Sequence, residues 1–244
     1  MKKLSVLALV LSLMAVSSLS LQAGGREGKL GISGAFDYAT YAMSDINAMA
    51  VPGQALLSSG MGGGGAITYG FTPAIEAGII INYLTASSDY SATVGVAPFD
   101  LKTTVKDSLP IIEILLGGNY VFPDVATGLD LKIGLGLGFD MLNGTSSNDT
   151  SLNGVSVFSY SSTVTGSGFG ALVSLGGEYF VSPQFSLGLD LGYRYASISP
   201  ITISSSGFSG TLTKAGGANA AADYSGLNIK VGGTFYIDMA SASK

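Results

Sequence analysis

The sequence predicts an all-β chain, a transmembrane up-and-down antiparallel β-barrel of eight strands, and three observations lead to this fold class. The first is hydropathy: mean hydropathy is +0.46 and only 11% of residues are charged, against about 25% in an ordinary soluble domain. No stretch beyond the N-terminus reaches the roughly 20 apolar residues that a membrane helix needs. The apolar residues are therefore spread over short segments. Strict alternation and recurring proline turns are the other two observations.

The N-terminus has the features of a cleavable secretory signal peptide over residues 1–23. Two lysines precede an apolar segment, residues 4–19, and Ala23 offers a small residue at the cleavage point. A membrane anchor is the alternative, but the apolar segment is short and no positive residues follow it directly. We therefore expect an exported chain in which residues 24–244 form one outer-membrane β-barrel domain.

Apolar and small or polar residues alternate strictly after residue 28, which is the period of a strand with two different faces. In 185–196, for example, Phe185, Leu187 and Leu189 alternate with Ser186, Gly188 and Asp190. Segments of this kind have about the length of a tilted membrane strand. The eight predicted strands are 29–38, 65–71, 75–84, 109–122, 129–141, 167–181, 185–196 and 227–237.

Alternation alone does not say which face is inside, so a soluble lipocalin-like barrel is the alternative. Its water-facing side would then consist of glycine, serine and few charges, unlike a soluble surface. Its interior would hold more bulk than an eight-stranded barrel can enclose. We therefore expect small and polar residues in the lumen and bulky residues against lipid, with aromatic girdles at the strand ends. One girdle would contain Tyr69, Phe71, Tyr120, Phe122, Tyr179, Phe185 and Phe235, and the other Tyr38, Tyr83, Phe139, Phe169 and Tyr195.

Three proline turns separate pairs of predicted strands. They follow aromatic strand ends, at Pro73, Pro123 and Pro183, where a fixed φ and a missing N–H suit a turn. Long connections rich in Gly, Ser, Thr and Asn alternate with these turns, as expected of extracellular loops. The four predicted loops are 41–64, 85–108, 143–165 and 197–225, with partial alternation continuing at 155–160 and 201–212.

The last predicted strand carries a more specific motif. Lys230, Gly232, Phe235 and Ile237 match a signal of the form polar, any, Gly, two of any, aromatic, any, hydrophobic. With the alternation and turns, this pattern resembles the small outer-membrane β-barrel superfamily that includes the Ail/Lom-type, Opa-type and OmpA N-terminal barrels. The resemblance implies the cell outer membrane of a Gram-negative bacterium and recognition of this signal by the barrel assembly machinery. The chain departs from the family in having seven residues, 238–244, after Ile237.

Few residues suited to catalysis are present. The chain contains no His and no Cys, which removes the usual general base and the usual metal ligands. Barrel enzymes of the outer membrane resemble one another in relying on a histidine. A carboxylate pair is the one remaining route, so we expect no enzyme, no cofactor and no metal site. The acidic charge balance also gives no reason to expect nucleic acid as a partner.

Charged residues fall on the face that alternation places inside the barrel. One interpretation is a paired network that fills the lumen, because buried charges need partners. The other is a water-filled passage whose acidic excess would prefer cations, although barrels of this size seldom enclose a channel. We favour the paired network. Its predicted members are Glu76, Glu113, Asp130, Lys132, Glu178, Asp190, Arg194 and Lys230, and alternation also places Lys29, Asp37 and Asp140 inside.

These observations predict a non-enzymatic, surface-exposed barrel whose loops act in envelope integrity, adhesion or binding of an external ligand. Loops on a rigid scaffold are where binding residues usually lie. The alternative is a narrow porin-like channel for small solutes or cations. The expected partners are outer-membrane lipid and lipopolysaccharide, the barrel assembly machinery and an extracellular ligand held by the loops.

Overall fold

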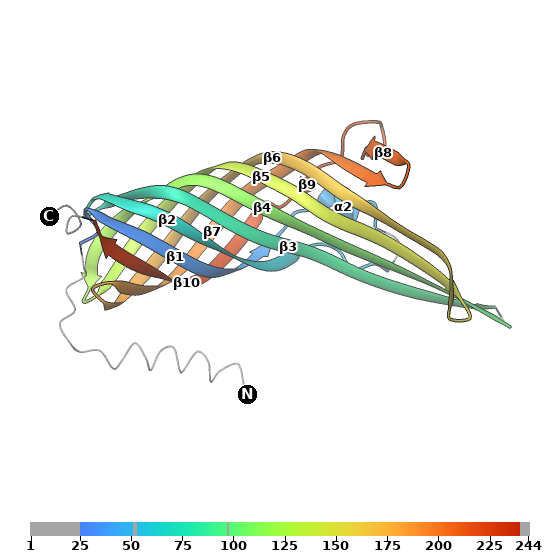
Figure 1. The fold of residues 1–244 in the computed structure, drawn as a ribbon, viewed down its shortest axis with the longest axis horizontal. Coiled ribbons are helices and arrows are strands. Elements are labelled where there is room, and N and C mark those ends of the chain that lie inside the picture. Colours follow the sequence, from blue (N-terminus) through green and yellow to red (C-terminus); the bar gives the residue numbers. More distant parts are fainter. Residues whose placement is uncertain (1–24, 51–52, 97, 240–244) are drawn as a thin grey trace.

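The computed structural model describes residues 25–50, 53–96 and 98–239. The predicted signal peptide, residues 1–23, lies outside the described residues. Within them, no helix is long and apolar enough to cross a membrane. The structure is instead dominated by one antiparallel sheet that curls into a tube (Figure 1).

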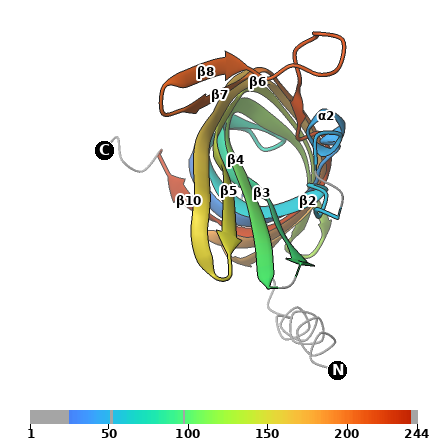
Figure 2. The same cartoon turned by 90° about the vertical axis from the view of Figure 1, so that its right-hand side faces the viewer.

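Eight strands form the barrel, as the sequence predicts. Neighbouring strands pair in chain order, and the last strand closes the ring by pairing with both the first and the seventh (Figure 2). The barrel strands are β1 (Lys29–Thr40), β2 (Ser59–Thr72), β3 (Ile75–Val96), β4 (Phe99–Ala126), β5 (Leu129–Leu152), β6 (Val155–Ser182), β7 (Phe185–Ser205) and β10 (Gly226–Asp238). Every predicted segment lies within one of these strands.

Two ends of the barrel differ in their connections. Short turns join β2 to β3 at Pro73 and β6 to β7 at Pro183, at what we call the short-turn end. The predicted turn at Pro123 is displaced, because β4 runs irregularly past this residue to Ala126 and residues 127–128 form the turn to β5. At the opposite end, the mouth, the connection 41–58 contains the short helix α2 (Ser44–Asn47). After β7 the chain forms β8 (Phe208–Thr211) and β9 (Ala222–Asp223), which both pair with β7.

The strands are longer than alternation indicated, and this corrects two of the predicted loops. Most of 85–108 and 143–165 is paired strand, because β3 and β4 pair as far as Val96↔Phe99 and β5 and β6 as far as Leu152↔Val155. The composition of these stretches, rich in Gly, Ser, Thr and Asn, is typical of loops. Hydroxyl side chains are compatible with strands, and Thr favours them.

Glycine allows the wall to bend sharply between β2 and β3. A Cβ added to Gly62 would collide with the carbonyl oxygen of Tyr83, and one added to Gly78 would collide with the carbonyl oxygen of Ile67. Such glycine kinks are a general means of curving a sheet tightly enough to close a barrel. The glycine-rich stretch before residue 66 is therefore part of the barrel wall, because β2 begins at Ser59.

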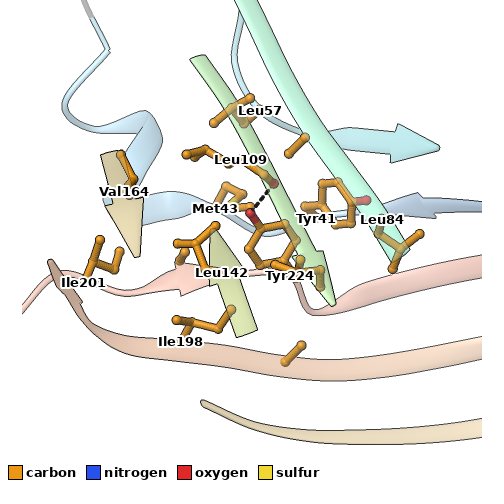
Figure 3. Close-up of a cluster of buried hydrophobic side chains, with 14 of the residues drawn as sticks. Tyr41, Met43, Leu57, Leu84, Leu109, Leu142, Val164, Ile198, Ile201 and Tyr224 are labelled. Carbon is orange, nitrogen blue, oxygen red and sulfur yellow. Dashed lines mark hydrogen bonds between the residues drawn. The ribbon is translucent and has the colours of Figure 1, made fainter. Parts of the chain in front are cut away.

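The outer surface of the barrel is apolar. Leu116 and Phe139 are 73% and 70% exposed, which fits a face that meets hydrocarbon. The aromatic residues predicted for the two girdles are exposed on this face, except that Tyr179 is half-buried. The inside differs from the prediction at the mouth, where the lumen is filled by large apolar side chains (Figure 3). Several of them, such as Met43, Leu57 and Tyr224, come from connections that fold back into the barrel.

Candidate functional site: charges in the barrel lumen

Arg26 forms the centre of a charged cluster at the short-turn end. Its guanidinium lies 2.7 Å from Glu178 Oε2, 2.9 Å from Asp130 Oδ2 and 3.4 Å from Glu76 Oε2. The Arg26 side chain is only 2% exposed. One cation thus faces three carboxylates in a space that water barely reaches.

Polar and aromatic groups complete this first cluster. Tyr236 Oη donates a hydrogen bond of 2.8 Å to Glu178, and Ser186 donates another to the same carboxylate. The Arg26 guanidinium carbon also lies 5.6 Å and 5.7 Å from the ring centres of Phe180 and Tyr236, within the range of a cation–π interaction. The rings and the ion pairs together close this end of the lumen.

Arg194 forms the centre of a second cluster, deeper in the barrel. Its Nε donates to Glu113 Oε1 at 3.0 Å and its Nη2 donates to Asp37 Oδ2 at 3.2 Å. Lys230 Nζ lies 3.0 Å from Asn82 Oδ1 and 3.8 Å from Asp37. The residues come from β1, β3, β4, β7 and β10, so the cluster ties strands from all around the ring.

A small cavity separates the two clusters. It has a volume of about 120 Å³ and is lined by residues that include Glu76, Glu178, Asp190 and Lys230, which leaves room for several water molecules. The Lys132–Asp190 pair, 3.3 Å apart and the most exposed of the lumen ion pairs, borders this cavity.

Asp140 is the least satisfied charge of the lumen. It is fully buried, and neither carboxylate oxygen has a hydrogen-bond partner among the described residues. Its register neighbour on β4 is Glu113, so two acidic side chains lie side by side. An unpartnered buried carboxylate is costly as an anion, so Asp140 is the least favourable position of the charged half.

Apolar packing closes the mouth above Asp140. Tyr41, Met43, Leu84 and Tyr224 are buried in this cluster. The two tyrosine rings meet edge to face with 5.1 Å between their centres, and Tyr224 Oη donates a 2.6 Å hydrogen bond to the carbonyl oxygen of Leu109 (Figure 3). The lumen is therefore blocked by charge pairs in one half and by apolar side chains in the other.

The eight charges named from the sequence all lie in the lumen, divided between the two clusters and the cavity wall. Glu76, Asp130 and Glu178 belong to the Arg26 cluster, and Glu113 and Lys230 to the Arg194 cluster. Lys29 is half-buried at the start of β1. Sequence reasoning missed Arg26, because it precedes the first strand and has no place in an alternating pattern. The one available signal was a lone arginine shortly before an apolar strand.

The residues of the last-strand signal lie on both faces of β10. Lys230 and Gly232 line the lumen cavity, whereas Phe235 and Ile237 are exposed on the outer face. Their recognition by an assembly machinery stays a prediction. In the part of the chain that the structure describes, no three His, Cys, Asp or Glu side chains are arranged to hold a metal ion.

The fold and its two surfaces define a class of protein. A closed ring of antiparallel strands with an apolar outer face and a charged interior is a transmembrane β-barrel. Residues 6–235 match the model of the "Outer membrane protein beta-barrel domain" family, and the chain belongs to this family. The protein accordingly resides in the cell outer membrane.

Solved structures similar to the chain are also outer-membrane proteins. OprG from Pseudomonas aeruginosa is 15% identical, with 88% of this chain and 98% of that one covered and a TM-score of 0.47. The N-terminal β-barrel domain of Pseudomonas aeruginosa OprF is 16% identical, with 86% and 98% covered and a TM-score of 0.36. Ail from Yersinia pestis is 14% identical, with 86% and 99% covered and a TM-score of 0.35. The comparison with curated proteins gives no match.

Proposed function

We propose that this protein is a non-enzymatic outer-membrane barrel with a closed lumen, whose long hairpins at the mouth face the outside and contact external partners. The observation that carries this proposal is the double closure of the lumen. Buried ion pairs around Arg26 and Arg194 cross the barrel, and the apolar cluster fills the space beyond them. Because the lumen is closed, external partners can reach the hairpins at the mouth but not the interior of the barrel.

The connections support the assignment of the mouth to the outside. Barrels of this kind have short turns on the periplasmic side and long extracellular connections. Here β3 and β4 run on together to Val96 and Phe99, and β5 and β6 to Leu152 and Val155. These hairpins extend well beyond α2 (Figure 1). We expect the aromatic girdles to contact outer-membrane lipid and lipopolysaccharide, and the β10 signal to contact the assembly machinery.

A narrow channel for small solutes or cations is the second candidate. The cavity of about 120 Å³ between the two charged clusters favours it, because a chamber with acidic walls is a starting point for cation passage. It would require the Arg26 cluster, the Arg194 cluster and the apolar mouth all to open.

Planar-bilayer recording on the refolded mature barrel separates the two functions. A closed lumen predicts electrical silence for the unchanged chain. A steady conductance that falls when Glu113 or Asp190 is replaced by the neutral amide would instead establish the channel. Heat-dependent gel mobility of each sample serves as the control for a folded barrel.

Surface display is tested separately on intact cells. A protease added outside should cut within 85–108 and 143–165 and leave the short turns at 73–74, 127–128 and 183–184 uncut. Protection of both hairpins in whole cells, with cleavage after the cells are broken, would reverse the proposed orientation.

A further inference from the structure

Four strand segments continue beyond the mouth as one sheet, which we call the projection: 85–96 of β3, 99–108 of β4, 145–152 of β5 and 155–162 of β6. At its base, the side chain of Gln54 donates hydrogen bonds to Ser88 and Asp107. The neighbouring barrel strands β2 and β7 do not pair with the projection. The pairing of β2 with β3 ends at Gly62↔Leu84, and the pairing of β6 with β7 begins at Thr163↔Ser204. The projection is the long extension at the far end of the molecule in Figure 1. It therefore has two outer edges.

The β6 edge of the projection carries no charge or proline that would discourage pairing with another strand, although a β-bulge at Val157 interrupts its register with β5. Residues 155–162 read Val-Ser-Val-Phe-Ser-Tyr-Ser-Ser, with no charge, proline or glycine, and 155–161 are all exposed. Among the described residues, this segment pairs only with β5, so its second row of backbone N–H and C=O groups has no ladder partner. Soluble edges normally carry charges, prolines or bulges that discourage such pairing. Of these, the segment has only the bulge, which leaves 158–162 in regular register with β5.

The opposite edge, on β3, is different. Its segment 85–96 includes Asp89, which lies 3.9 Å from Lys106 of the next strand, and it also includes Gly95. A charge and a glycine both make it less favourable for a further strand to pair with this edge. The two edges of one sheet thus differ in the features that control edge-to-edge pairing, and the β6 edge is the open one.

The two faces of the projection also differ. The face that continues the lumen wall carries apolar side chains, among them Val94, Leu101 and Phe158, which are 61%, 42% and 59% exposed. The register places these positions on one side, together with Thr103 and Thr150, and places Lys102 and Asp149 on the other. A strand added to the β6 edge would extend the apolar face as well as the ladder.

Self-complementarity favours a second copy of this chain as the added strand. An uncharged segment paired antiparallel with itself brings no like charges together, and it places its apolar residues on the same face as their counterparts. Antiparallel pairing of identical edges needs a two-fold axis perpendicular to the sheet, and this axis reverses the direction of the barrel. Two copies in one membrane both point outward, so their projecting strands cannot run antiparallel. Copies in two facing membranes can.

We infer that the β6 edge of the projection, Val155–Ser162, is a homotypic docking edge that joins barrels of two facing outer membranes. The inference deepens the proposed function and rests on its surface display of the hairpins. Eight residues of strand span about 27 Å, so one pair buries little surface and binds weakly. Many copies on each membrane make the contact strong through multivalency.

The test uses vesicles that carry the full mature barrel, labelled in two colours, with mouth orientation checked by protease. Mixed populations should form two-coloured clusters. Adding V157K and S161K together should lower clustering at least tenfold, because equal charges would face each other across the new pair. The control, S147K with S151K, places two lysines one strand inward, opposite Ser161 and next to the bulge at Val157, and should leave clustering unchanged. Heat-dependent gel mobility shows that each variant is folded.

A charge-swap experiment distinguishes repulsion between paired edges from a general effect of the substitutions on clustering. Vesicles with V157E and S161E should not cluster among themselves but should cluster with the V157K and S161K vesicles. No rescue, equal loss with the control variant, or equal clustering with protein-free vesicles would each overturn the inference. If the hairpins are cut in whole cells and folded barrels still fail to cluster, homotypic docking is wrong and surface display stands. If the hairpins are protected in whole cells, both proposals fail.

Discussion

The two halves of the lumen are closed by opposite chemistry. Toward the short-turn end, Arg26 and Arg194 hold five carboxylates in buried ion pairs, whereas at the mouth Leu84, Ile111 and their neighbours pack without charge. An ion-pair closure depends on every partner, since removal of one leaves the others buried and uncompensated. An apolar closure loses stability in proportion to the volume removed. The halves should therefore respond differently to single substitutions.

The largest effect is expected at the centre of the charged half. Arg194→Ala leaves Glu113 and Asp37 without their cation in a site where the arginine is fully buried. We expect a loss of about 3–5 kcal/mol in the free energy of unfolding, measured by denaturant titration of the barrel refolded in detergent micelles. Lys102→Ala, on the exposed side of the projection, is the control and should change less than about 0.5 kcal/mol. Equal stabilities of the two variants would show that the charges find other partners.

Arg26→Ala should have the next largest effect, a loss of about 3 kcal/mol in the free energy of unfolding. Three carboxylates lose their shared cation, but this cluster lies next to the barrel end, where water can enter and screen them. The measurement is the same denaturant titration, with Lys102→Ala again as the control. A free energy of unfolding equal to that of the unchanged protein would contradict the ion-pair account.

The apolar half should respond to volume. Leu84→Ala removes a fully buried side chain from the mouth cluster and should cost about 2–4 kcal/mol. Leu116→Ala is the matched control, because Leu116 is 73% exposed on the outer face and faces detergent before and after the change. If both variants lose the same stability, the mouth cluster is not a packed core.

The two-residue alternation of the sequence predicted the strands and the side chains that face the lumen from them. The eight strands and the inward placement of Glu113 and Arg194 follow from alternation, because every second side chain of a strand shares one face. Arg26, Met43 and Tyr224 lie outside regular strands, so no period indicates that they turn into the lumen. Their positions depend on tertiary packing. The projection was missed in part for a related reason: its hydroxyl-rich face resembles a loop in composition, although the residues pair across strands.

The smallest expected effect concerns the link between the two connections that cover the mouth. Lys214 Nζ donates a 3.0 Å hydrogen bond to Asp45 Oδ2, and the backbone N–H of Ala221 donates a second of 3.2 Å to the same oxygen. These two bonds, the lysine's first, hold the pKa of Asp45 below its ordinary value. Because the folded pKa is the lower one, the link is present above about pH 4 and is lost as the pH falls through the folded pKa.

The chemical shift of the Ala221 amide in an NMR titration reports this change. Its midpoint should lie below about pH 4, and Asp45→Asn should abolish the titration while leaving the Ala220 amide, which donates to the carbonyl oxygen of Leu212, unaffected. A midpoint at the ordinary value would mean that Lys214 and Ala221 do not hold the carboxylate in solution. In that case the connections 41–58 and 212–225 would be joined by apolar packing and by backbone hydrogen bonds such as that from Met43 N–H to the carbonyl oxygen of Asp223, without an ionic contact like those of the charged half.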